Sequence, residues 1–295
     1  MTSRIVLGAA TYGRISQTEV NVLLATALES GITKIDTAHG YEGSEERIGV
    51  FLGTGNQFEI NTKVGLPDPS TFTPKGIKYS VEDSLKRLGI ESLNTLFVHS
   101  LDSTYLTQEN IGAMLELKQQ GKIKQIGYAG DNENLEAATN IESFDEFIAT
   151  FNIIDQSNAS VIRSAQQDSD FYFKLVLGQA IWTNLEWKRR VRSNKIMRFI
   201  FRKPPVPESW TDYSSRFNTF KGEIVGNDYA ATFLRFALFS GSAKQNVILG
   251  THSAQHIRDA VQIEQNQKNF EALNAAKYEE LWARKSSSDW RAHIG

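Results

Sequence analysis

The chain has 295 residues, of which 40% are hydrophobic and 22% charged, and its formal net charge at pH 7 is −2. This composition is typical of a globular protein, and the nearly balanced charge gives no general attraction to nucleic acid or to membrane surfaces. The absence of cysteine excludes disulfides and thiolate metal sites and fits a reducing, cytoplasmic location. No apolar run is long enough to predict a transmembrane helix, and no signal peptide or metal site is expected.

Short apolar segments of β-type composition alternate along the chain with amphipathic segments of helical period. The expected strands are Ile5–Gly8, Ile32–Asp36, Phe58–Thr62, Thr95–Val98, Ile123–Tyr128, Phe151–Ile154, Leu175–Leu177 with Ala180–Trp182, and Val247–Leu249. The expected helices are Glu19–Leu28, Glu45–Leu52, Gly76–Leu88, Ile111–Gln120, Glu133–Thr139, Val161–Gln166, Tyr229–Phe239 and Ala254–Ile263. Eight strand-then-helix units predict an α/β fold, a (β/α)8 TIM barrel that forms a single domain over residues 1–295. An open doubly wound sheet is the alternative, but no Gly-x-Gly-x-x-Gly pattern follows the first strand.

Two segments interrupt this regular pattern. Residues 182–226, after the seventh strand, are too long for an ordinary βα loop. Eight basic residues lie between positions 188 and 203, and they predict either a solvated face or a basic cover over the barrel mouth that meets an anionic group. The C-terminal extension, residues 268–295, contains an amphipathic stretch that we interpret as a helix packed on the barrel wall.

Polar side chains stand where several expected strands end. Asp36 ends the second strand, Tyr41 lies in the loop after it, Lys63 follows the third strand and His99 follows the fourth. In a barrel these ends meet at one mouth. A phenol is a poor acid because its reference pKa is about 10, and a neighbouring ammonium, itself held by a carboxylate, favours the phenolate. With a neutral histidine to orient a carbonyl, the four residues predict a proton-donating site.

Each polar or aromatic residue near the mouth also has an ordinary structural interpretation. A strand-end aspartate is often a turn or cap residue, a single lysine is often at the surface, and a single histidine is often a core residue with its hydrogen bonds satisfied. Asp102 fits either a loop acid or a substrate contact. Tyr12 fits either a wall aromatic or a platform at the mouth, and Trp182 fits either core packing or a contact with the substrate.

The order of several short motifs resembles that of one known family. The motifs are Asp36-Thr-Ala-x-x-Tyr41-x-x-Ser44-Glu45, Asn61-Thr-Lys63-Val-Gly65, Ser84–Gly89 running into Phe97-Val-His99, Leu117–Gly127 and Val247–Thr251. Together they are similar to the aldo-keto reductases. The resemblance implies a (β/α)8 barrel with a nicotinamide cofactor, usually NADPH with NADH as the alternative, extended across the mouth. It also implies Tyr41 as the general acid, Lys63 and Asp36 as the groups that tune it, and His99 as the carbonyl-orienting residue.

The resemblance extends to the cofactor contacts, although several residue types differ. Relatives carry Ser-Asn after the fifth strand for the nicotinamide carboxamide, whereas this chain has Ala129-Gly130 followed by Asp131-Asn132. After the eighth strand, Thr251, Ser253 and the start of the next helix are expected to take a phosphate. The expected cofactor-binding residues are Thr11, Tyr12, Asp131, Asn132, Gln156, Gly250, Thr251, Ser253, His256 and Asp259.

The function that the resemblance implies is NAD(P)H-dependent interconversion of an aldehyde or ketone and an alcohol. The expected partner is a small carbonyl or alcohol substrate, and the basic residues at 188–203 favour an anionic one. Two alternatives stay open at this point. One is a non-redox acid/base enzyme, a lyase or isomerase, and the other is a regulatory subunit that senses a nucleotide. Neither the substrate's identity nor the oligomeric state is indicated by the sequence.

Overall fold

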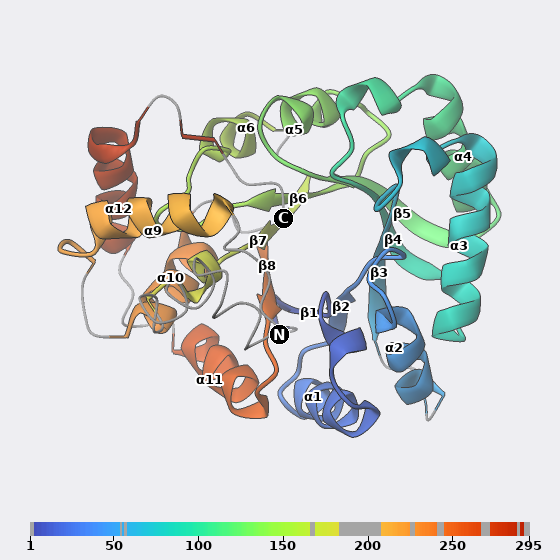
Figure 1. The fold of residues 1–295 in the computed structure, drawn as a ribbon, viewed down its shortest axis with the longest axis horizontal. Helices are drawn as coiled ribbons and strands as arrows, with labels where there is room; N and C mark the ends of the chain where they lie inside the picture. Colours follow the sequence, from blue (N-terminus) through green and yellow to red (C-terminus); the bar gives the residue numbers. More distant parts are fainter. Residues whose placement is uncertain are drawn as a thin grey trace, which may run out of the picture.

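The computed structural model describes residues 3–53, 55, 58–165, 169–182, 208–224, 228–240, 245–266, 272–287 and 290–291. Eight parallel strands pair in sequence order, and β8 pairs with β1 to close the barrel (Figure 1). They are β1 (Ile5–Gly8), β2 (Lys34–Asp36), β3 (Glu59–Val64), β4 (Leu93–His99), β5 (Ile123–Ala129), β6 (Glu146–Thr150), β7 (Asp170–Lys174) and β8 (Gln245–Gly250). The prediction of a single (β/α)8 barrel is therefore confirmed.

Helices surround the barrel, and several begin where the sequence supplies a capping residue. They are α1 (Gln17–Glu29), α2 (Ser44–Leu52), α3 (Pro74–Leu88), α4 (Gln108–Gln119), α5 (Asn132–Thr139), α6 (Ala159–Ser164), α9 (Glu208–Phe220), α10 (Tyr229–Phe239), α11 (Ala254–Gln265) and α12 (Ala272–Lys285). Ser16 forms a capping box with Glu19 at the start of α1, and Thr73 caps α3 directly before its first-turn proline. These local signals explain why the helix predictions lie close to the observed bounds.

The sixth and seventh strands correct the sequence prediction. The apolar runs Phe151–Ile154 and Leu175–Leu177 are loop segments, and Ala180–Trp182 overlaps a 3-10 turn. The true strands lie a few residues earlier in the chain. The physical reason is that β6 and β7 have charged or polar residues at positions that face the inside of the barrel. A search for continuous apolar runs therefore selects the neighbouring loops instead.

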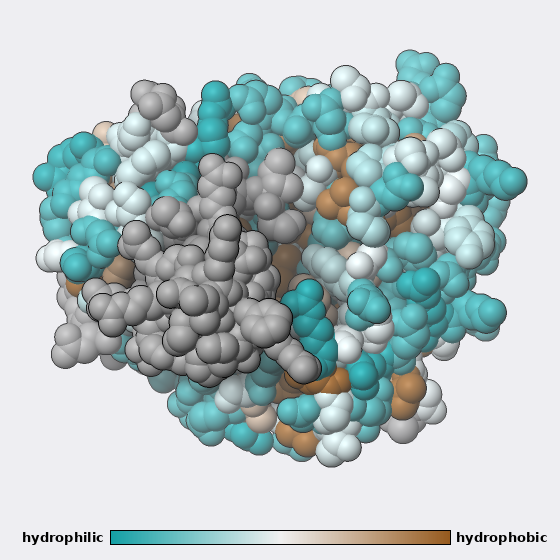
Figure 2. All heavy atoms as spheres, viewed as in Figure 1, coloured by the Kyte–Doolittle hydropathy of each residue, from teal (hydrophilic) through white to brown (hydrophobic). Residues whose placement is uncertain are grey.

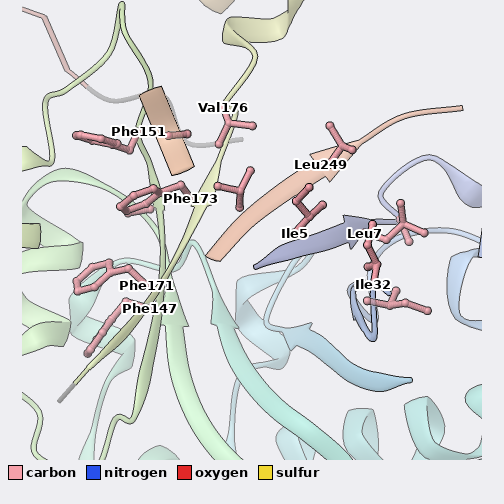
Figure 3. Packing of buried hydrophobic residues seen from close by; sticks show 14 of the residues in the cluster. Ile5, Leu7, Ile32, Phe147, Phe151, Phe171, Phe173, Val176 and Leu249 are labelled. Atoms are coloured by element: carbon pink, nitrogen blue, oxygen red, sulfur yellow. The ribbon is translucent and has the colours of Figure 1, made fainter. Parts of the chain in front are cut away.

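The alternation along β7 defines which of its residues face inward. Figure 3 shows Phe171 and Phe173 on one side of this strand, packed with Phe147 and Phe151. The ring centroids of Phe147 and Phe171 are 5.5 Å apart, and those of Phe151 and Phe173 are 4.8 Å apart. Because successive side chains point to opposite faces, the residues between and beyond these phenylalanines, including Lys174, face the barrel interior.

Two separate hydrophobic clusters result from this alternation. The larger one lies between the strands and the surrounding helices. The smaller one fills the inside of the barrel and consists of Val6, Phe97, Ala129, Ile148 and Tyr172. A filled interior leaves the carboxyl ends of the strands as the place where polar side chains can gather.

Helix α9, which follows β7, packs against helix α12 of the C-terminal extension, and α12 also contacts α10 (Figure 1). Arg216 of α9 is buried and forms an ion pair with buried Asp155 in the loop after β6, with N–O distance 3.1 Å. The same guanidinium lies 5.0 Å from the ring centroid of Trp290. The amphipathic stretch of the extension is indeed a helix, α12, with Tyr278 and Leu281 buried. The basic residues predicted to cover the mouth, 188–203, lie outside the described residues.

The outer faces of the helices are largely polar. Figure 2 shows hydrophilic side chains over α3 and α4, with hydrophobic residues gathered nearer the middle of this face. No helix within the described ranges is long and apolar enough to cross a membrane.

Candidate active site

Three of the four predicted catalytic residues end neighbouring strands. Asp36 is the last residue of β2, Lys63 lies one residue before the end of β3, and His99 is the last residue of β4. All three side chains are buried, with relative exposures of 5%, 3% and 6%. Tyr41 is half-buried in the loop between β2 and α2. The fold therefore brings the predicted residues to the same end of the barrel.

Lys63 is the centre of this cluster. Its ammonium donates to both carboxylate oxygens of Asp36, at 2.8 and 2.7 Å, and to the carbonyl oxygen of Thr37 at 2.7 Å. It also lies 5.2 Å from the ring centroid of Tyr41. Burial alone would lower the pKa of Lys63, but the Asp36 carboxylate and the Tyr41 side chain together raise it. A charged ammonium is therefore fixed beside the phenol.

His99 faces Tyr41 from the adjacent side. Their rings meet edge to face with centroids 5.5 Å apart. Burial and, to a lesser extent, the charges of Lys63 and Lys174 together lower the pKa of His99 from 6.5 to about 3. Its Nδ1 atom is buried and has no hydrogen-bond partner among the described residues. A neutral imidazole beside a phenol can orient a carbonyl oxygen between them.

The loop that carries Tyr41 is fixed on both sides. The hydroxyl of Ser44 donates to the carbonyl oxygen of Ala9 at 2.9 Å. Gly13 packs so closely on this loop that an added Cβ would lie 1.6 Å from the carbonyl oxygen of Glu42. From α3, Arg87 donates to the carbonyl oxygen of His39 at 3.2 Å. Packing of this kind holds a catalytic side chain in one position.

The same guanidinium also joins a network of acids. Arg87 contacts Asp83 at 2.6 Å, Glu46 at 3.4 Å and buried Glu45 at 3.6 Å. Burial raises the pKa of Glu45, while hydrogen bonds and the nearby cation oppose that shift. Because Glu45 and Glu46 begin α2, the network connects α3 to the helix that follows the Tyr41 loop.

A second ion pair lies at the mouth, on strands β5 to β7. Lys174, the last residue of β7, contacts the carboxylate of Asp131 at 3.0 Å. Asp131 also accepts from the backbone N–H of Thr150 at 2.7 Å and from the side-chain amide of Asn158 at 2.8 Å. Sequence reasoning missed Lys174 because it placed the seventh strand too late. The alternating pattern Asp170-Phe-Tyr-Phe-Lys174 is the signal that could have located it.

Asp131 and Asn132, two of the predicted cofactor contacts, differ in how far they are enclosed by the protein. The Asp131 carboxylate is fully enclosed by protein groups. Asn132 follows it with a positive φ of 57°, and its backbone N–H donates to Asn158 at 2.9 Å. The side chain of Asn132 is half-buried. Of this pair, Asn132 is therefore the more accessible.

Two other predicted cofactor contacts, Tyr12 and Gln156, are buried within the protein. Tyr12 is fully buried in the large hydrophobic cluster. The amide of Gln156 donates to the carbonyl oxygens of Ile153 and Tyr278, at 3.3 and 3.0 Å.

The two predicted substrate contacts are similarly occupied. Asp102 is exposed and caps a 3-10 turn by accepting from Thr104. Trp182 packs against Phe217, Tyr229 and Phe233. These positions favour a loop acid for Asp102 and a packing residue for Trp182. The burial of Tyr12 in the large hydrophobic cluster likewise favours a wall aromatic.

The last group of predicted contacts lies where β8 leads into α11. Ser253 caps α11, and Thr251 accepts from the N–H of Ser253 at 3.1 Å. Thr251 also pairs with His256 Nδ1 at 3.1 Å. A Cβ added at Gly250 would meet no atom within 4 Å, so the backbone is open there.

Two predicted residues extend this group. Thr11, from the loop after β1, pairs with His252, and Asp259 accepts from Gln255 one turn away. The hydroxyl groups of Thr251 and Ser253, the imidazoles and the helix N-terminus together suit an anion such as phosphate.

Comparison with known proteins agrees with this geometry. The model of the aldo/keto reductase family matches residues 4–278, which is most of the chain. The chain therefore belongs to the aldo/keto reductase family.

Among curated relatives, an aldo-keto reductase of Strobilurus tenacellus is 35% identical over 121 residues, covering 39% of this chain. Human aflatoxin B1 aldehyde reductase member 2 is 32% identical over 129 residues, covering 41% of this chain. Each match covers 36% of the relative's own length.

Solved structures match over nearly the whole chain. An aldo-keto reductase from Bacillus halodurans in its holo form has a TM-score of 0.75 at 18% identity, covering 95% of this chain and 92% of that one. An aldo-keto reductase from Klebsiella pneumoniae in complex with NADPH has a TM-score of 0.72 at 17% identity, covering 99% and 95%. At these identities the likeness concerns the fold.

Proposed function

We propose that this protein reduces a small aldehyde or ketone to an alcohol, or catalyses the reverse reaction, with NADPH as its cofactor. The observation that carries the proposal is the buried cluster in which Lys63 binds Asp36 and lies against the ring of Tyr41, while the ring of His99 meets that of Tyr41 edge to face. Membership of the aldo/keto reductase family supports the same reaction.

The roles in this cluster follow from charge and position. Tyr41 gives a proton to the carbonyl oxygen, because it is the half-buried hydroxyl of the group. Lys63 holds its charge beside the phenol and so favours loss of that proton, while Asp36 fixes the ammonium. Neutral His99 orients the carbonyl oxygen. When bound, the nicotinamide supplies the hydride that reaches the carbonyl carbon.

The proposed cofactor site extends from the mouth to the start of α11. Thr251, Ser253 and His256 would hold a phosphate, because their side chains and the helix N-terminus gather beside the open backbone at Gly250. Asn132 would contact the nicotinamide, and Thr11 would lie near the phosphate end. We propose smaller roles for Tyr12, Asp131, Gln156 and Asp259, as side chains that shape the walls of this site. NADH is the alternative cofactor.

Turnover of a Tyr41→Phe variant tests the proposal. Removing a general acid should lower kcat by about a hundredfold to ten-thousandfold. Tyr79→Phe is the matched control, because Tyr79 is 68% exposed on α3, and its kcat should not change. Undiminished turnover by Tyr41→Phe with a good aldehyde would contradict the proposed role.

Titration with the cofactor distinguishes a reductase from the two alternatives, a nucleotide sensor and a non-redox acid/base enzyme. Quenching of tryptophan fluorescence by NADPH or NADH, followed by oxidation of the cofactor when an aldehyde is added, supports the reductase. Quenching without oxidation across a panel of aldehydes and ketones would favour a nucleotide sensor. No quenching by either cofactor would favour non-redox acid/base chemistry.

A further inference from the structure

The proposed reaction does not use Lys174, although this residue stands at the mouth. Its side chain points into the barrel because Phe171 and Phe173 of the same strand point outward (Figure 3). It pairs in register with Thr150, the last residue of β6. Only 15% of its side chain is exposed. A lysine that ends a barrel strand and faces inward lies where substrates bind in this fold.

The surroundings of Lys174 differ from those of Lys63. Asp131 is the one ion-pair or hydrogen-bond partner that the described part of the chain gives the Lys174 ammonium. Asp131 itself is held independently, by Thr150 and Asn158. The carboxylate therefore stays in place without the lysine, and the ammonium keeps N–H donors that can turn toward a ligand.

The backbone around the second ion pair also departs from ordinary strand geometry. Ser100 follows His99 with φ of 51°, Asn132 follows Asp131 with φ of 57°, and Leu175 follows Lys174 with φ of 55°. None of these residues is glycine, so each left-handed conformation is energetically unfavourable. Such conformations gather at binding and catalytic sites, where the chain must turn sharply after placing a functional side chain.

We propose that Lys174 binds a carboxylate on the substrate, so that the preferred substrates are carbonyl compounds that also carry a carboxylate. The proposal rests on the proposed reductase function, and it names the substrate class of that same site. The carbonyl oxygen lies between Tyr41 and His99, and the substrate's carboxylate reaches across the mouth to the ammonium on β7.

Charge favours an anionic substrate over a cationic one. Asp36 is neutralised by Lys63, and Asp131 by Lys174 and its hydrogen bonds. Lys63 and Lys174 both act electrostatically on His99, so both positive charges lie near the place where the carbonyl binds. A carboxylate would accept a charge-assisted hydrogen bond from Lys174, whereas a substrate ammonium could accept none from it.

The experiment compares rigid substrates that differ in one charge. We suggest 3-carboxybenzaldehyde and 4-carboxybenzaldehyde, the methyl ester of each, and benzaldehyde as the neutral parent. The two isomers place the carboxylate at different distances from the carbonyl. For at least one isomer, kcat/KM of the wild-type protein should exceed that of its ester by about tenfold or more, as expected for one charge-assisted hydrogen bond.

Lys174→Met keeps the length of the side chain and removes its charge. The ratio of kcat/KM between acid and ester should fall to about one, through a rise in KM for the acid, and Lys174→Arg should restore part of it. Because a single variant leaves Asp131 without its cation, Lys174→Met with Asp131→Asn is a second variant that removes both charges. Lys118→Met is the matched control, since Lys118 forms a 2.7 Å ion pair with Asp145 away from the mouth.

The outcomes are distinct. Equal kcat/KM for acids and esters would overturn the role of Lys174 while the reductase function stands. A preference for the acid that Lys174→Met and the double variant leave unchanged would do the same. Weaker NADPH binding by these variants, with the acid-to-ester ratio kept, would assign Lys174 to the cofactor and also overturn it. Failure to oxidise NADPH or NADH with any of the aldehydes would overturn both proposals together.

Discussion

Two lysine–aspartate ion pairs lie at the mouth of this barrel, and their surroundings differ. On β2 and β3, Lys63 and Asp36 are almost completely enclosed, and the ammonium has hydrogen bonds to Asp36 and Thr37. At the ends of β5 to β7, Lys174 is partly exposed, and hydrogen bonds from Thr150 and Asn158 hold the Asp131 carboxylate. In the first pair the lysine is fixed, whereas in the second pair the aspartate is fixed.

This difference indicates two uses for the same chemical pair. A fixed ammonium keeps its charge at one place, which suits control of a neighbouring phenol. An ammonium with one protein partner has N–H groups left to donate to a ligand, which suits recognition of a substrate. The following predictions test this contrast through stability and activity.

The largest effect is expected when Lys63 is replaced by methionine. Asp36 would then be a buried charge without a partner, which typically costs about 3–5 kcal/mol of unfolding free energy. Urea unfolding of wild type and variant measures this loss. Lys63→Met combined with Asp36→Leu should recover much of the stability but none of the activity. An equal loss in the single and double variants would contradict the account of a paired charge.

The pH dependence of stability should report His99. Its pKa is about 3 in the folded protein and near 6.5 when unfolded, so the unfolded chain takes up a proton first as the pH falls through this range. Between these values the folded protein should lose up to about 1.4 kcal/mol per pH unit through this residue. Below the folded pKa both the folded and the unfolded protein carry this proton, so the loss of stability through His99 is complete and stops growing.

Replacing His99 with glutamine isolates this contribution, because glutamine does not titrate. Between pH 7 and pH 3 the unfolding free energy of the wild type should fall more steeply than that of the variant. Parallel curves across the whole range would show that His99 titrates normally in the folded state.

A smaller loss of stability is expected for Lys174→Met. Asp131 keeps its hydrogen bonds from Thr150 and Asn158, so the cost should be about 1–2 kcal/mol, below that of Lys63→Met. The same urea measurement applies. A loss as large as that of Lys63→Met would show that both lysines are structural to the same degree, which removes the contrast between the pairs.

The smallest effect is expected for Arg87→Leu. Its side chain is 29% exposed, and the buried Glu45 keeps its hydrogen bond from Thr62, so the three ion pairs of Arg87, with Asp83, Glu46 and Glu45, should together contribute about 1 kcal/mol or less. Its hydrogen bond to His39, two residues before Tyr41, should still make kcat fall without a change in KM. Lys118→Met, at 35% exposure, is the control for loss of an outer ion pair. A change in KM instead of kcat would place Arg87 outside the support of Tyr41.

The sequence predicts the polar residues at the ends of β2 to β4 better than those at the ends of β5 to β7. Tyr41 follows Asp36 by five residues, Lys63 follows the alternating segment Phe58–Thr62, and His99 follows the apolar run Leu96–Val98, so short sequence patterns place all four residues at the ends of strands or in the loop that follows. Lys174 ends a strand whose inward-facing positions are polar, and the rule for buried parallel strands fails there.

Two residues in the loop after β6 have partners far away in the chain. Gln156 binds the carbonyl oxygen of Tyr278 in α12, which lies more than a hundred positions later. Asp155 pairs with Arg216 of the insertion in the same way. Contacts of this kind depend on how the insertion and the extension pack on the barrel, and no short motif records them.

Transfer of a deuterium label tests the central claim most directly. The protein would be incubated with an aldehyde and NADPH carrying deuterium on one face of nicotinamide C4, and the alcohol would be analysed by NMR. We expect deuterium at the former carbonyl carbon with the label on one face and none with the label on the other. An alcohol without deuterium from either labelled cofactor, or no alcohol at all, would contradict the proposed function.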